Sequence, residues 1–316
     1  MILIESKSNN PYFNIATEDY LLHQFSEDVF FLYIDEPSVI CGKHQNALAE
    51  INVNYVDNQK ISVVRRLSGG GTVYHDMGNL NFCFIINATD GKLVDFKKHT
   101  LPLLKALELI GVNPILGERN DIIIEGFKVS GNAEHVWKNR VLHHGTLLFN
   151  SDLSQLSEAI QTSPSRFEDK SVKSKRSKVA NISSFIDRSI TLDLFKKKII
   201  DVVSMFYEIT NVRLTTSQES EINKLVDSKY STWEWNFGYS PKYTFKNSLI
   251  SGDLNYSILL FVDKGVIKNA EFLINDEINE FWSSEILGNH HKSEDLIQLF
   301  NGFLSEKVIK SLFFGD

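Results

Sequence analysis

Three consecutive glycines follow two arginines at the end of a predicted strand. The segment reads Arg65-Arg66-Leu67-Ser68-Gly69-Gly70-Gly71-Thr72-Val73-Tyr74-His75-Asp76-Met77-Gly78-Asn79. Glycines let the backbone approach a ligand closely, and successive backbone N–H groups can form an anion-binding nest. Arginines beside such a turn offer paired donors to phosphate or carboxylate. The segment is neither a P-loop nor a dinucleotide fingerprint, because it lacks Gly-Lys-Ser/Thr and no helical pattern follows it. A flexible hairpin turn with solvated arginines is the alternative, which the arginine pair and the His-Asp-x-Gly-Asn sequence disfavour.

A second candidate segment carries a lysine on a β-rich stretch. Asn120 and Asp121 precede the sequence Lys128-Val129-Ser130-Gly131-Asn132-Ala133. A lysine beside a phosphate can offset the charge that develops in a transition state. An exposed lysine at a strand edge is the ordinary alternative, and this segment by itself favours that alternative.

Two adjacent histidines occur in the sequence His143-His144-Gly145-Thr146. Neighbouring residues on a strand point to opposite faces, so the two rings do not share a ligand. Because no third ligand lies at a typical spacing, zinc is not expected here. We expect one histidine to pack in the core and the other to lie near a site.

A charged, polar stretch occupies residues 162–178 and contains Lys170, Lys173, Lys175, Arg176 and Lys178. A solvated charge cluster on a mobile loop is the baseline interpretation. The alternative is a loop that folds over an anionic intermediate or meets an acidic protein partner.

Composition limits the classes of function. The chain has 316 residues, of which 42% are hydrophobic, and a formal net charge of −7. This length predicts about two domains, and the acidic total argues against a general electrostatic grip on nucleic acid. It still allows a local basic site, for which Arg65, Arg66 and Lys128 are the candidates. Cys41 and Cys83 are the two cysteines, and a chain with so few fits a reducing compartment. No apolar run is long enough to span a membrane, and no leader pattern opens the chain, so we expect a soluble, cytoplasmic protein.

The elements that must position these residues follow from hydrophobic periodicity. Strands are predicted at 2–5, 29–34, 38–42, 61–66, 81–87, 121–131 (as a hairpin), 140–150, 257–265 and 266–275. Helices are predicted after an Asn14 cap and at 96–111, 153–160, 191–208 and 293–314. Bulky residues throughout 81–87 indicate a strand that is buried on both faces. The pattern indicates an α/β protein with strands dominating its first half and a small strand-strand-helix unit at its end.

The motifs in this order resemble those of bacterial-type lipoate–protein ligases, in the biotin/lipoate ligase superfamily. The likeness is carried by RRLSGGGTVYHDMGNLNF (65–82), RNDIII (119–124), KVSGNA (128–133), HHGTLLFNSDL (143–153), SVKSKRSKVANI (171–182) and STWEWNFGYSP (231–241). It extends over nearly the whole chain. The chain departs from the family at Glu134-His135-Val136-Trp137, where an aromatic and a basic residue are common.

This resemblance implies an α/β fold of the α+β type. It has a mixed-sheet catalytic domain at 1–241, like that of biotin and lipoate ligases, and a small α/β accessory domain at 242–316. It also implies a two-step reaction. Lipoate and ATP, with Mg²⁺, give lipoyl-AMP and pyrophosphate. The lipoyl group then passes to a lysine of a carrier domain, such as a 2-oxo acid dehydrogenase E2 subunit or a glycine-cleavage H protein. A monomer that contacts neither nucleic acid nor membrane is expected.

The resemblance also assigns roles to residues. Lys128 and Asp121 are implied to be catalytic, and Asp121 to lie near Mg²⁺. Segment 171–181 is implied to cover the adenylate. The residues implied to bind lipoate are Arg66, Lys128, His144 and Gly145. The residues implied to bind ATP or lipoyl-AMP are Arg66, Ser68, Gly69, Gly70, Gly71, Thr72, Val73, Tyr74, His75, Asn79, Asn120, Lys128, Ser130, Gly131 and Ala133.

Other functions remain open at this stage. An octanoyl or lipoyl transferase of the same fold would form a covalent acyl-cysteine. Both cysteines precede the lysine motif, and Cys83 lies in a strand that looks buried, which counts against that route. A biotin ligase would have a different glycine-rich motif. A non-catalytic binder of acylated carriers would not need Arg66, Lys128 and Asp121.

Overall fold

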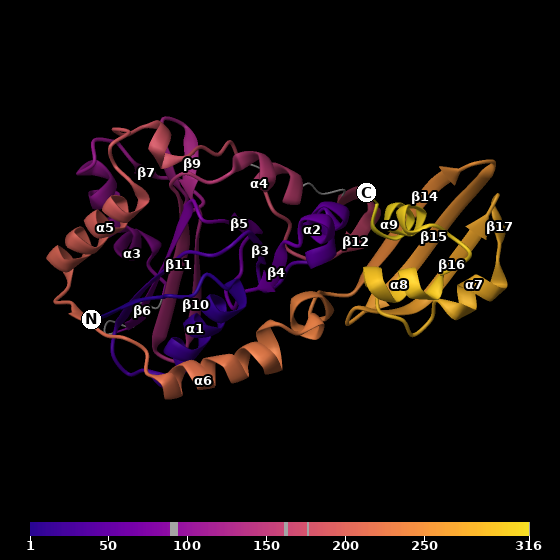
Figure 1. Ribbon diagram of the computed structural model, residues 1–316, viewed down its shortest axis with the longest axis horizontal. Coiled ribbons are helices and arrows are strands. Elements are labelled where there is room, and N and C mark those ends of the chain that lie inside the picture. Colours follow the sequence, from indigo (N-terminus) through magenta and orange to yellow (C-terminus); the bar gives the residue numbers. More distant parts are fainter. Residues whose placement is uncertain (89–93, 161–163, 176, 316) are drawn as a thin grey trace.

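A mixed six-stranded sheet forms the centre of the larger part of the molecule (Figure 1). The computed structural model describes residues 1–88, 94–160, 164–175 and 177–315. The strand order is β10-β11-β6-β2-β1-β13. The strands are β1 (Ile2–Glu5), β2 (Val29–Tyr33), β6 (Asn79–Asn87), β10 (Asn132–Trp137), β11 (Arg140–Leu148) and β13 (Thr210–Asn211). β1 runs parallel to β2 and β13, whereas β6, β10 and β11 pair antiparallel.

Each face of this sheet packs against its own set of helices. Phe82 and Phe84 of β6 pack in one cluster with residues of α3 (Phe96–Glu108) and α5 (Leu192–Phe206). The alternate residues Cys83 and Ile85 belong to a second cluster with residues of α1 (Pro11–Gln24) and α6 (Thr216–Leu225). Successive side chains on a strand point to opposite faces, so β6 is buried on both sides, which confirms the prediction.

Two three-stranded sheets carry the candidate site residues. One has the order β4-β3-β5 and the other β7-β8-β9. The first consists of β3 (Ser38–Cys41), β4 (Ser62–Arg65) and β5 (Val73–His75), and the second of β7 (Ile115–Leu116), β8 (Ile122–Ile124) and β9 (Phe127–Ser130). β8 and β9 form the predicted hairpin, which turns at Glu125 and Gly126 with positive φ at both residues. Helices α2 (Val53–Gln59) and α4 (Leu153–Ala159) contact each other beside β5.

The C-terminal end forms a five-stranded antiparallel sheet, drawn at the right of Figure 1. Its order is β12-β14-β15-β16-β17. The strands are β12 (Phe167–Asp169), β14 (Tyr243–Ser251), β15 (Leu254–Asp263), β16 (Val266–Ile274) and β17 (Glu277–Ile278). Helices α7 (Glu280–Glu285), α8 (Ser293–Leu299) and α9 (Glu306–Phe314) accompany it. One continuous apolar cluster joins this sheet to α2 and β3.

Three local predictions were wrong. Helix α1 is capped by Asn10, whose side chain accepts from the backbone of Tyr12 and Phe13, and Pro11 occupies the first turn. Asn14 instead lies inside the helix and donates to Asp35. The predicted helix at 293–314 is two helices, because Gly302 has φ 82° and Ser305 caps a new helix.

The third difference concerns the polar stretch at 162–178. Residues 161–163 and Arg176 lie outside the described residues. The described part is not a detached loop, because β12 pairs with β14 in the C-terminal sheet. Among the described residues, no helix is long and apolar enough to cross a membrane.

Candidate active site

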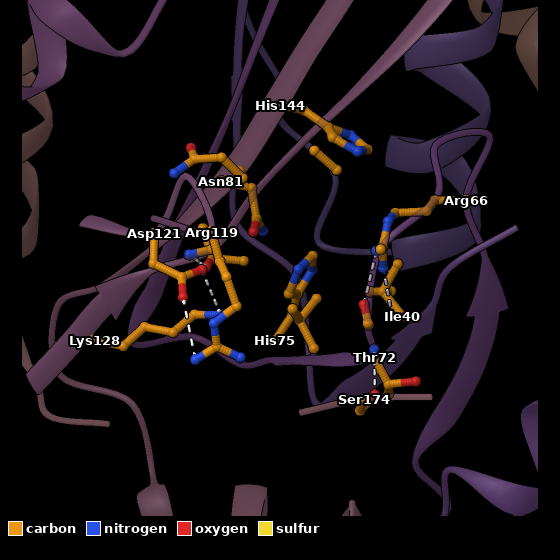
Figure 2. Close-up of a pocket in the computed structure, with 18 of the residues that line it drawn as sticks. Ile40, Arg66, Thr72, His75, Asn81, Arg119, Asp121, Lys128, His144 and Ser174 are labelled. Atoms are coloured by element: carbon orange, nitrogen blue, oxygen red, sulfur yellow. Dashed lines mark hydrogen bonds and ion pairs between the residues drawn. The ribbon is translucent and has the colours of Figure 1, made fainter. Parts of the chain in front are cut away.

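A pocket opens between the two small sheets and the end of β11 (Figure 2). Its walls come from the glycine-rich loop before β5, the β8–β9 hairpin, the start of β10, and residues 173–175. Its lining includes five cationic side chains, those of Arg66, Arg119, Lys128, Lys173 and Lys175. The net-negative protein therefore carries a locally basic pocket, as the sequence predicts.

Arg66 shapes the glycine-rich loop. Its guanidinium donates to the carbonyl oxygens of Gly69 and Gly71 at 2.6 and 2.7 Å, and to that of Ile40 at 2.9 Å. Burial lowers its pKa to about 10, so it stays a cation at neutral pH. The loop is thus wrapped around a buried positive charge, which leaves little freedom for its backbone.

The loop also contacts two distant segments at short range. A Cβ atom built on Gly42 would lie 2.2 Å from the carbonyl oxygen of Gly70, so only glycine fits there. The backbone N–H of Thr72 donates to Ser174 Oγ at 2.9 Å, a contact drawn in Figure 2. Gln45 Nε2 donates to the same hydroxyl at 3.1 Å. Segment 173–175 therefore lies directly against the loop.

A buried chain of hydrogen bonds positions Arg66 from behind. Glu18 Oε2 is 2.7 Å from His144 Nδ1, and His144 Nε2 is 2.6 Å from Ser68 Oγ. Ser68 Oγ accepts from Arg66 Nε at 2.9 Å. A carboxylate at Nδ1 requires the proton there, so the neutral ring accepts at Nε2. His144 reaches the pocket and also orients the arginine through Ser68.

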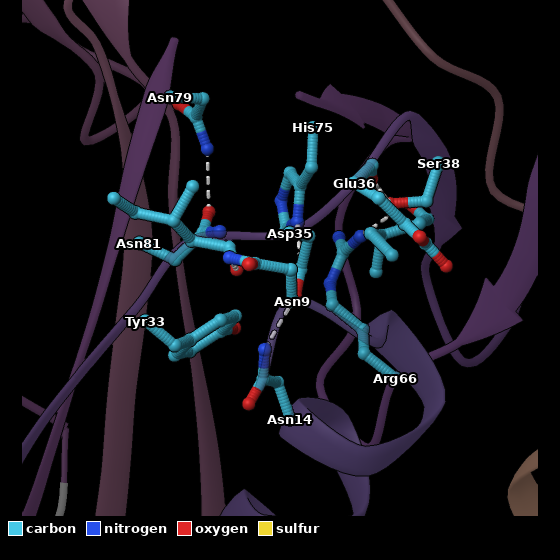
Figure 3. A network of polar contacts seen from close by, with 12 residues as sticks. Asn9, Asn14, Tyr33, Asp35, Glu36, Ser38, Arg66, His75, Asn79 and Asn81 are labelled. Carbon is cyan, nitrogen blue, oxygen red and sulfur yellow. Dashed lines mark hydrogen bonds and ion pairs between the residues drawn. The ribbon is translucent and has the colours of Figure 1, made fainter. Parts of the chain in front are cut away.

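A second polar chain supports the opposite wall (Figure 3). Asp35 accepts from Asn14 Nδ2 at 2.7 Å and lies 2.8 Å from His75 Nδ1. The Asp35 side chain is fully buried. Beside it, Asn79 donates to Asn81 Oδ1 at 2.6 Å, and Asn81 lines the pocket. Buried hydrogen bonds therefore support this wall, although Asn79 Oδ1 and Asn81 Nδ2 have no hydrogen-bond partner among the described residues.

Lys128 and Asp121 face each other on the β8–β9 side. Lys128 Nζ lies 2.9 Å from Asp121 Oδ1, and Arg119 Nη2 lies 3.9 Å from Asp121 Oδ2. The backbone of Lys128 pairs with the covering segment, since its N–H donates to Lys178 O and its carbonyl accepts from Ala180. The backbone of Lys128 thus joins the hairpin to residues 178–180.

Apolar side chains also line the pocket, namely those of Ile15, Tyr33, Ile40 and Val73. Tyr33 OH donates to Glu18 Oε1 at 3.0 Å, which satisfies its hydroxyl and leaves the ring as wall. The pocket can therefore hold a ligand with an apolar arm and an anionic head.

Comparisons with known proteins show the family to which the chain belongs. The model of the lipoyl protein ligase A/B catalytic domain matches residues 10–204. Lipoate–protein ligase 1 of Staphylococcus aureus is 43% identical over 270 residues, which are 84% of this chain and 82% of that protein. The chain belongs to the lipoate–protein ligase family. The predicted family, and with it the prediction of an enzyme, are confirmed.

Solved structures of the family share the fold. Lipoate–protein ligase A bound with ATP has a TM-score of 0.66 at 27% identity, covering 75% of this chain and 98% of its own. A bipartite archaeal lipoate protein ligase from Thermoplasma acidophilum, described with its E2 lipoyl domain, has a TM-score of 0.63 at 27% identity. It covers 75% of this chain and 96% of its own. The predicted α/β fold of lipoate ligases is confirmed.

The family motifs converge only in part on the pocket. Of the residues predicted from them, those that line it are Arg66, Gly70, Gly71, Thr72, Val73, His75, Asp121, Lys128, Gly131, Ala133, His144 and Gly145. Those that do not line it are Ser68, Gly69, Tyr74, Asn79, Asn120 and Ser130. Ser68 and Asn79 lie behind the lining residues and contact them through the hydrogen bonds described above. Tyr74 is buried in the core and donates to Gln155. The binding roles of all these residues stay predictions.

Sequence reasoning missed several lining residues of this lipoate–protein ligase. They include Ile15, Asn81, Arg119, Asn132, Thr146 and Ser174. Tyr33 and Asn81 are paired residues of the neighbouring strands β2 and β6. The signal for Ile15 was weak, because a helix residue far from every motif reaches the site only through packing.

Arg65 was wrongly grouped with the anion-binding cations. Its side chain is fully buried and points away from the pocket, because neighbouring residues on a strand face opposite sides. It donates to the carbonyls of Gln45 and Asn236 at 2.8 and 2.7 Å. Arg65 therefore joins the segment before α2 to the segment before the C-terminal sheet.

Both cysteines of the chain are free and buried. Burial raises the pKa of Cys41, and raises that of Cys83 well above its ordinary value. Thiolates are the nucleophilic form, so neither thiol is suited to accept an acyl group.

Proposed function

We propose that the protein is an ATP-dependent lipoate–protein ligase. It activates lipoate to lipoyl-AMP and transfers the lipoyl group to a lysine of a lipoyl carrier domain. The observation that carries this proposal is the mixed lining of the pocket. The pocket is lined by the apolar side chains of Ile15, Tyr33 and Ile40, by the cationic side chain of Lys128, and by the glycine-rich loop at Gly70. Lipoate has an apolar arm with a carboxylate end, and ATP supplies the anion.

The first step needs positive charge rather than a protein nucleophile. The lipoate carboxylate attacks the α-phosphorus of ATP, and the bond to the leaving pyrophosphate breaks. Lys128 offsets charge on the transferring phosphoryl group, and Arg66 holds the backbone donors of the loop in place. Arg119, Lys173 and Lys175 face the same space and attract the departing anion. Positioning and electrostatics therefore account for the chemistry.

The residues present fit a magnesium ion. Mg²⁺ is commonly held by one or two carboxylates together with substrate phosphates. The Asp121 carboxylate is 10% exposed and faces the pocket between Arg119 and Lys128, which provides one such ligand. A bound Mg²⁺ would neutralise phosphate charge. Asp121 is the residue that would hold it.

The second step requires a neutral amine. The carrier lysine attacks the carbonyl carbon of lipoyl-AMP, AMP leaves, and the amine loses one proton. In this proposal Asp121 orients this amine or takes its proton. The likeness to the archaeal ligase described with its E2 lipoyl domain supports a lipoyl domain as the partner. Action on a glycine-cleavage carrier, a monomeric state and a cytoplasmic location stay predictions.

We also propose that residues 242–316 act as an accessory domain beside a catalytic domain of residues 1–241. Strands β14 to β17 and helices α7 to α9 all fall in the C-terminal range. None of the residues that line the pocket comes from it. Its contribution would therefore be to carrier recognition or to movement rather than to the chemical groups.

Pyrophosphate release tests the proposal directly. The purified protein is mixed with ATP, Mg²⁺ and lipoate without any carrier, and pyrophosphate is measured. Release that depends on lipoate is expected, because the first step needs no carrier. Absence of release from folded protein would overturn the ligase assignment, and carrier labelling from octanoyl-thioester donors without ATP would support the transferase instead.

A further inference from the structure

A second cluster of chemically active side chains lies outside the pocket. His99 on α3, Glu134 on β10 and His143 on β11 bring three ligand atoms within 4.8 Å of one another. Glu134 Oε1 is 2.9 Å from His143 Nδ1 and 3.1 Å from His99 Nδ1. Two imidazoles and one carboxylate therefore converge on one point.

The pairing of β10 and β11 places this cluster behind the pocket wall. Ala133 pairs with His144, and both line the pocket. Glu134 pairs with His143 one position along, so their side chains point to the other face of the sheet. That face is covered by α3, which contributes His99. The cluster and the pocket thus share two strands but not one cavity.

The cluster is buried and incompletely satisfied. The side chains of His143, Glu134 and His99 are 0%, 3% and 6% exposed. Glu134 Oε2 has no hydrogen-bond partner among the described residues. An unpaired carboxylate oxygen in the interior is costly. A group that uses both oxygens of Glu134 would remove that cost.

We propose that His99, Glu134 and His143 bind a zinc ion. Two imidazole nitrogens and one carboxylate form a common donor set for Zn²⁺, and the unpaired Glu134 Oε2 offers a fourth donor. Mg²⁺ and Ca²⁺ prefer sites made of oxygen ligands, so two histidines select against them. The sequence spacing did not indicate this site, because the third ligand comes from a helix on the sheet's covered face.

Binding requires only a shift of protons within the rings. In the metal-free state each imidazole donates its Nδ1–H to Glu134 Oε1. When a metal takes Nδ1, the proton must sit on Nε2. His143 Nε2 lies 3.4 Å from Thr100 Oγ1, so that hydroxyl can accept it and fix the ring in the ligating tautomer.

A bound ion would cross-link parts of the fold. It would join α3 to strands β10 and β11 immediately behind Ala133 and His144. It would contact neither ATP nor lipoate, so the site is independent of the proposed ligase chemistry. We expect it to stabilise the wall of the pocket.

Metal titration of the full chain tests the site. Protein treated with a chelator and then dialysed is titrated with Co²⁺ as a spectroscopic probe and with Zn²⁺ in competition. We expect one Co²⁺ per chain, with visible absorption that Zn²⁺ abolishes, and a rise of several degrees in the melting temperature. Folded protein that binds neither ion would overturn the proposal.

Matched variants locate the ion. Glu134→Gln and His99→Gln remove a ligand while keeping side-chain size, and each should weaken Co²⁺ binding at least about tenfold. His135→Gln lies on the same strand but faces the other side, and it should bind Co²⁺ as the wild type does. Circular dichroism establishes that each variant is folded. Wild-type binding by folded Glu134→Gln, or loss of binding in His135→Gln alone, would contradict the assignment.

Discussion

Lys128 Nζ and Asp121 Oδ1 lie 2.9 Å apart across the β8–β9 hairpin. The Lys128 side chain is 25% exposed and that of Asp121 is 10% exposed, so both groups face the pocket without being sealed from solvent. A pair in this position can open when a phosphate arrives, because the lysine exchanges one oxygen anion for another. The lysine is thus held ready by the carboxylate.

Replacement of this lysine gives the first prediction. Lys128→Ala should lower the rate of lipoate-dependent pyrophosphate release by about 10²- to 10³-fold, because a charge that stabilises the transition state is lost. The free energy of unfolding in urea should change little, since a partly exposed ion pair contributes little to stability. Lys170→Ala is the control, because Lys170 is exposed and does not line the pocket. Wild-type turnover in Lys128→Ala would refute the role.

Alanine substitutions at two glycines near the loop should affect the kinetics differently. Gly42→Ala would put a Cβ 2.2 Å from the Gly70 carbonyl oxygen, so the loop must move. Gly69→Ala meets nothing closer than 3.9 Å, at His44. We therefore expect Gly42→Ala to raise the KM for ATP and lower kcat, and Gly69→Ala to stay near wild type. Steady-state kinetics measure both, and equal behaviour of the two variants would count against a backbone-built binding loop.

Removal of both cysteines should leave the ligase active. Cys41→Ala with Cys83→Ala deletes two buried thiols, which costs stability on the order of 1 kcal/mol each through small cavities. Pyrophosphate release and carrier lipoylation should persist, because neither thiol takes part in the chemistry. Lost activity in a double variant that retains its circular dichroism spectrum would favour an acyl-thioester route.

A buried histidine makes stability depend on pH. Burial lowers the pKa of His291 to about 4, whereas in the unfolded chain it lies near 6.5. Between these values the unfolded chain binds a proton that the native protein does not, so stability falls as the pH falls. The loss between pH 8 and pH 5 should be about 2 kcal/mol.

Urea unfolding at the two pH values measures this loss. The ring lies 2.9 Å from the Tyr243 hydroxyl and 2.6 Å from the Phe313 carbonyl, so His291→Gln keeps a polar group but cannot titrate. That variant should be less stable throughout, with a smaller difference between pH 8 and pH 5. An unchanged difference would show that other groups cause the pH dependence.

Much of the fold was predictable because it follows local patterns. The apolar alternation of β6 and the Glu125-Gly126 turn are set by neighbouring residues. The N-cap of helix α1 was predicted at Asn14 rather than at Asn10, because both asparagines precede residues with helical spacing. The side chain of Asn14 bonds to Asp35, a partner in the loop after β2 that local pattern cannot show.

The site was predictable as a set of motifs but not as a geometry. Because neighbouring residues on a strand face opposite sides, the strand pattern already puts the side chains of Arg65 and Arg66 on different sides. The wrong grouping of Arg65 with the anion-binding cations was therefore avoidable. The chain from Glu18 through His144 to Ser68 joins residues far apart in sequence. Such contacts depend on how helix α1 packs on the sheet, which no single segment encodes.

The segment after β12 acts as a tether of fixed length between the C-terminal sheet and the pocket. Asp169 ends a strand of that sheet, and Ser174 accepts the hydrogen bond of Thr72. The residues between them, even fully extended, span no more than about 18 Å. A rotation of the C-terminal sheet beyond that reach must either strip β12 from β14 or pull Ser174 away from the glycine loop. We therefore predict that a rotation of the C-terminal sheet that exceeds this reach and keeps β12 paired also draws Ser174 away from the glycine-rich loop.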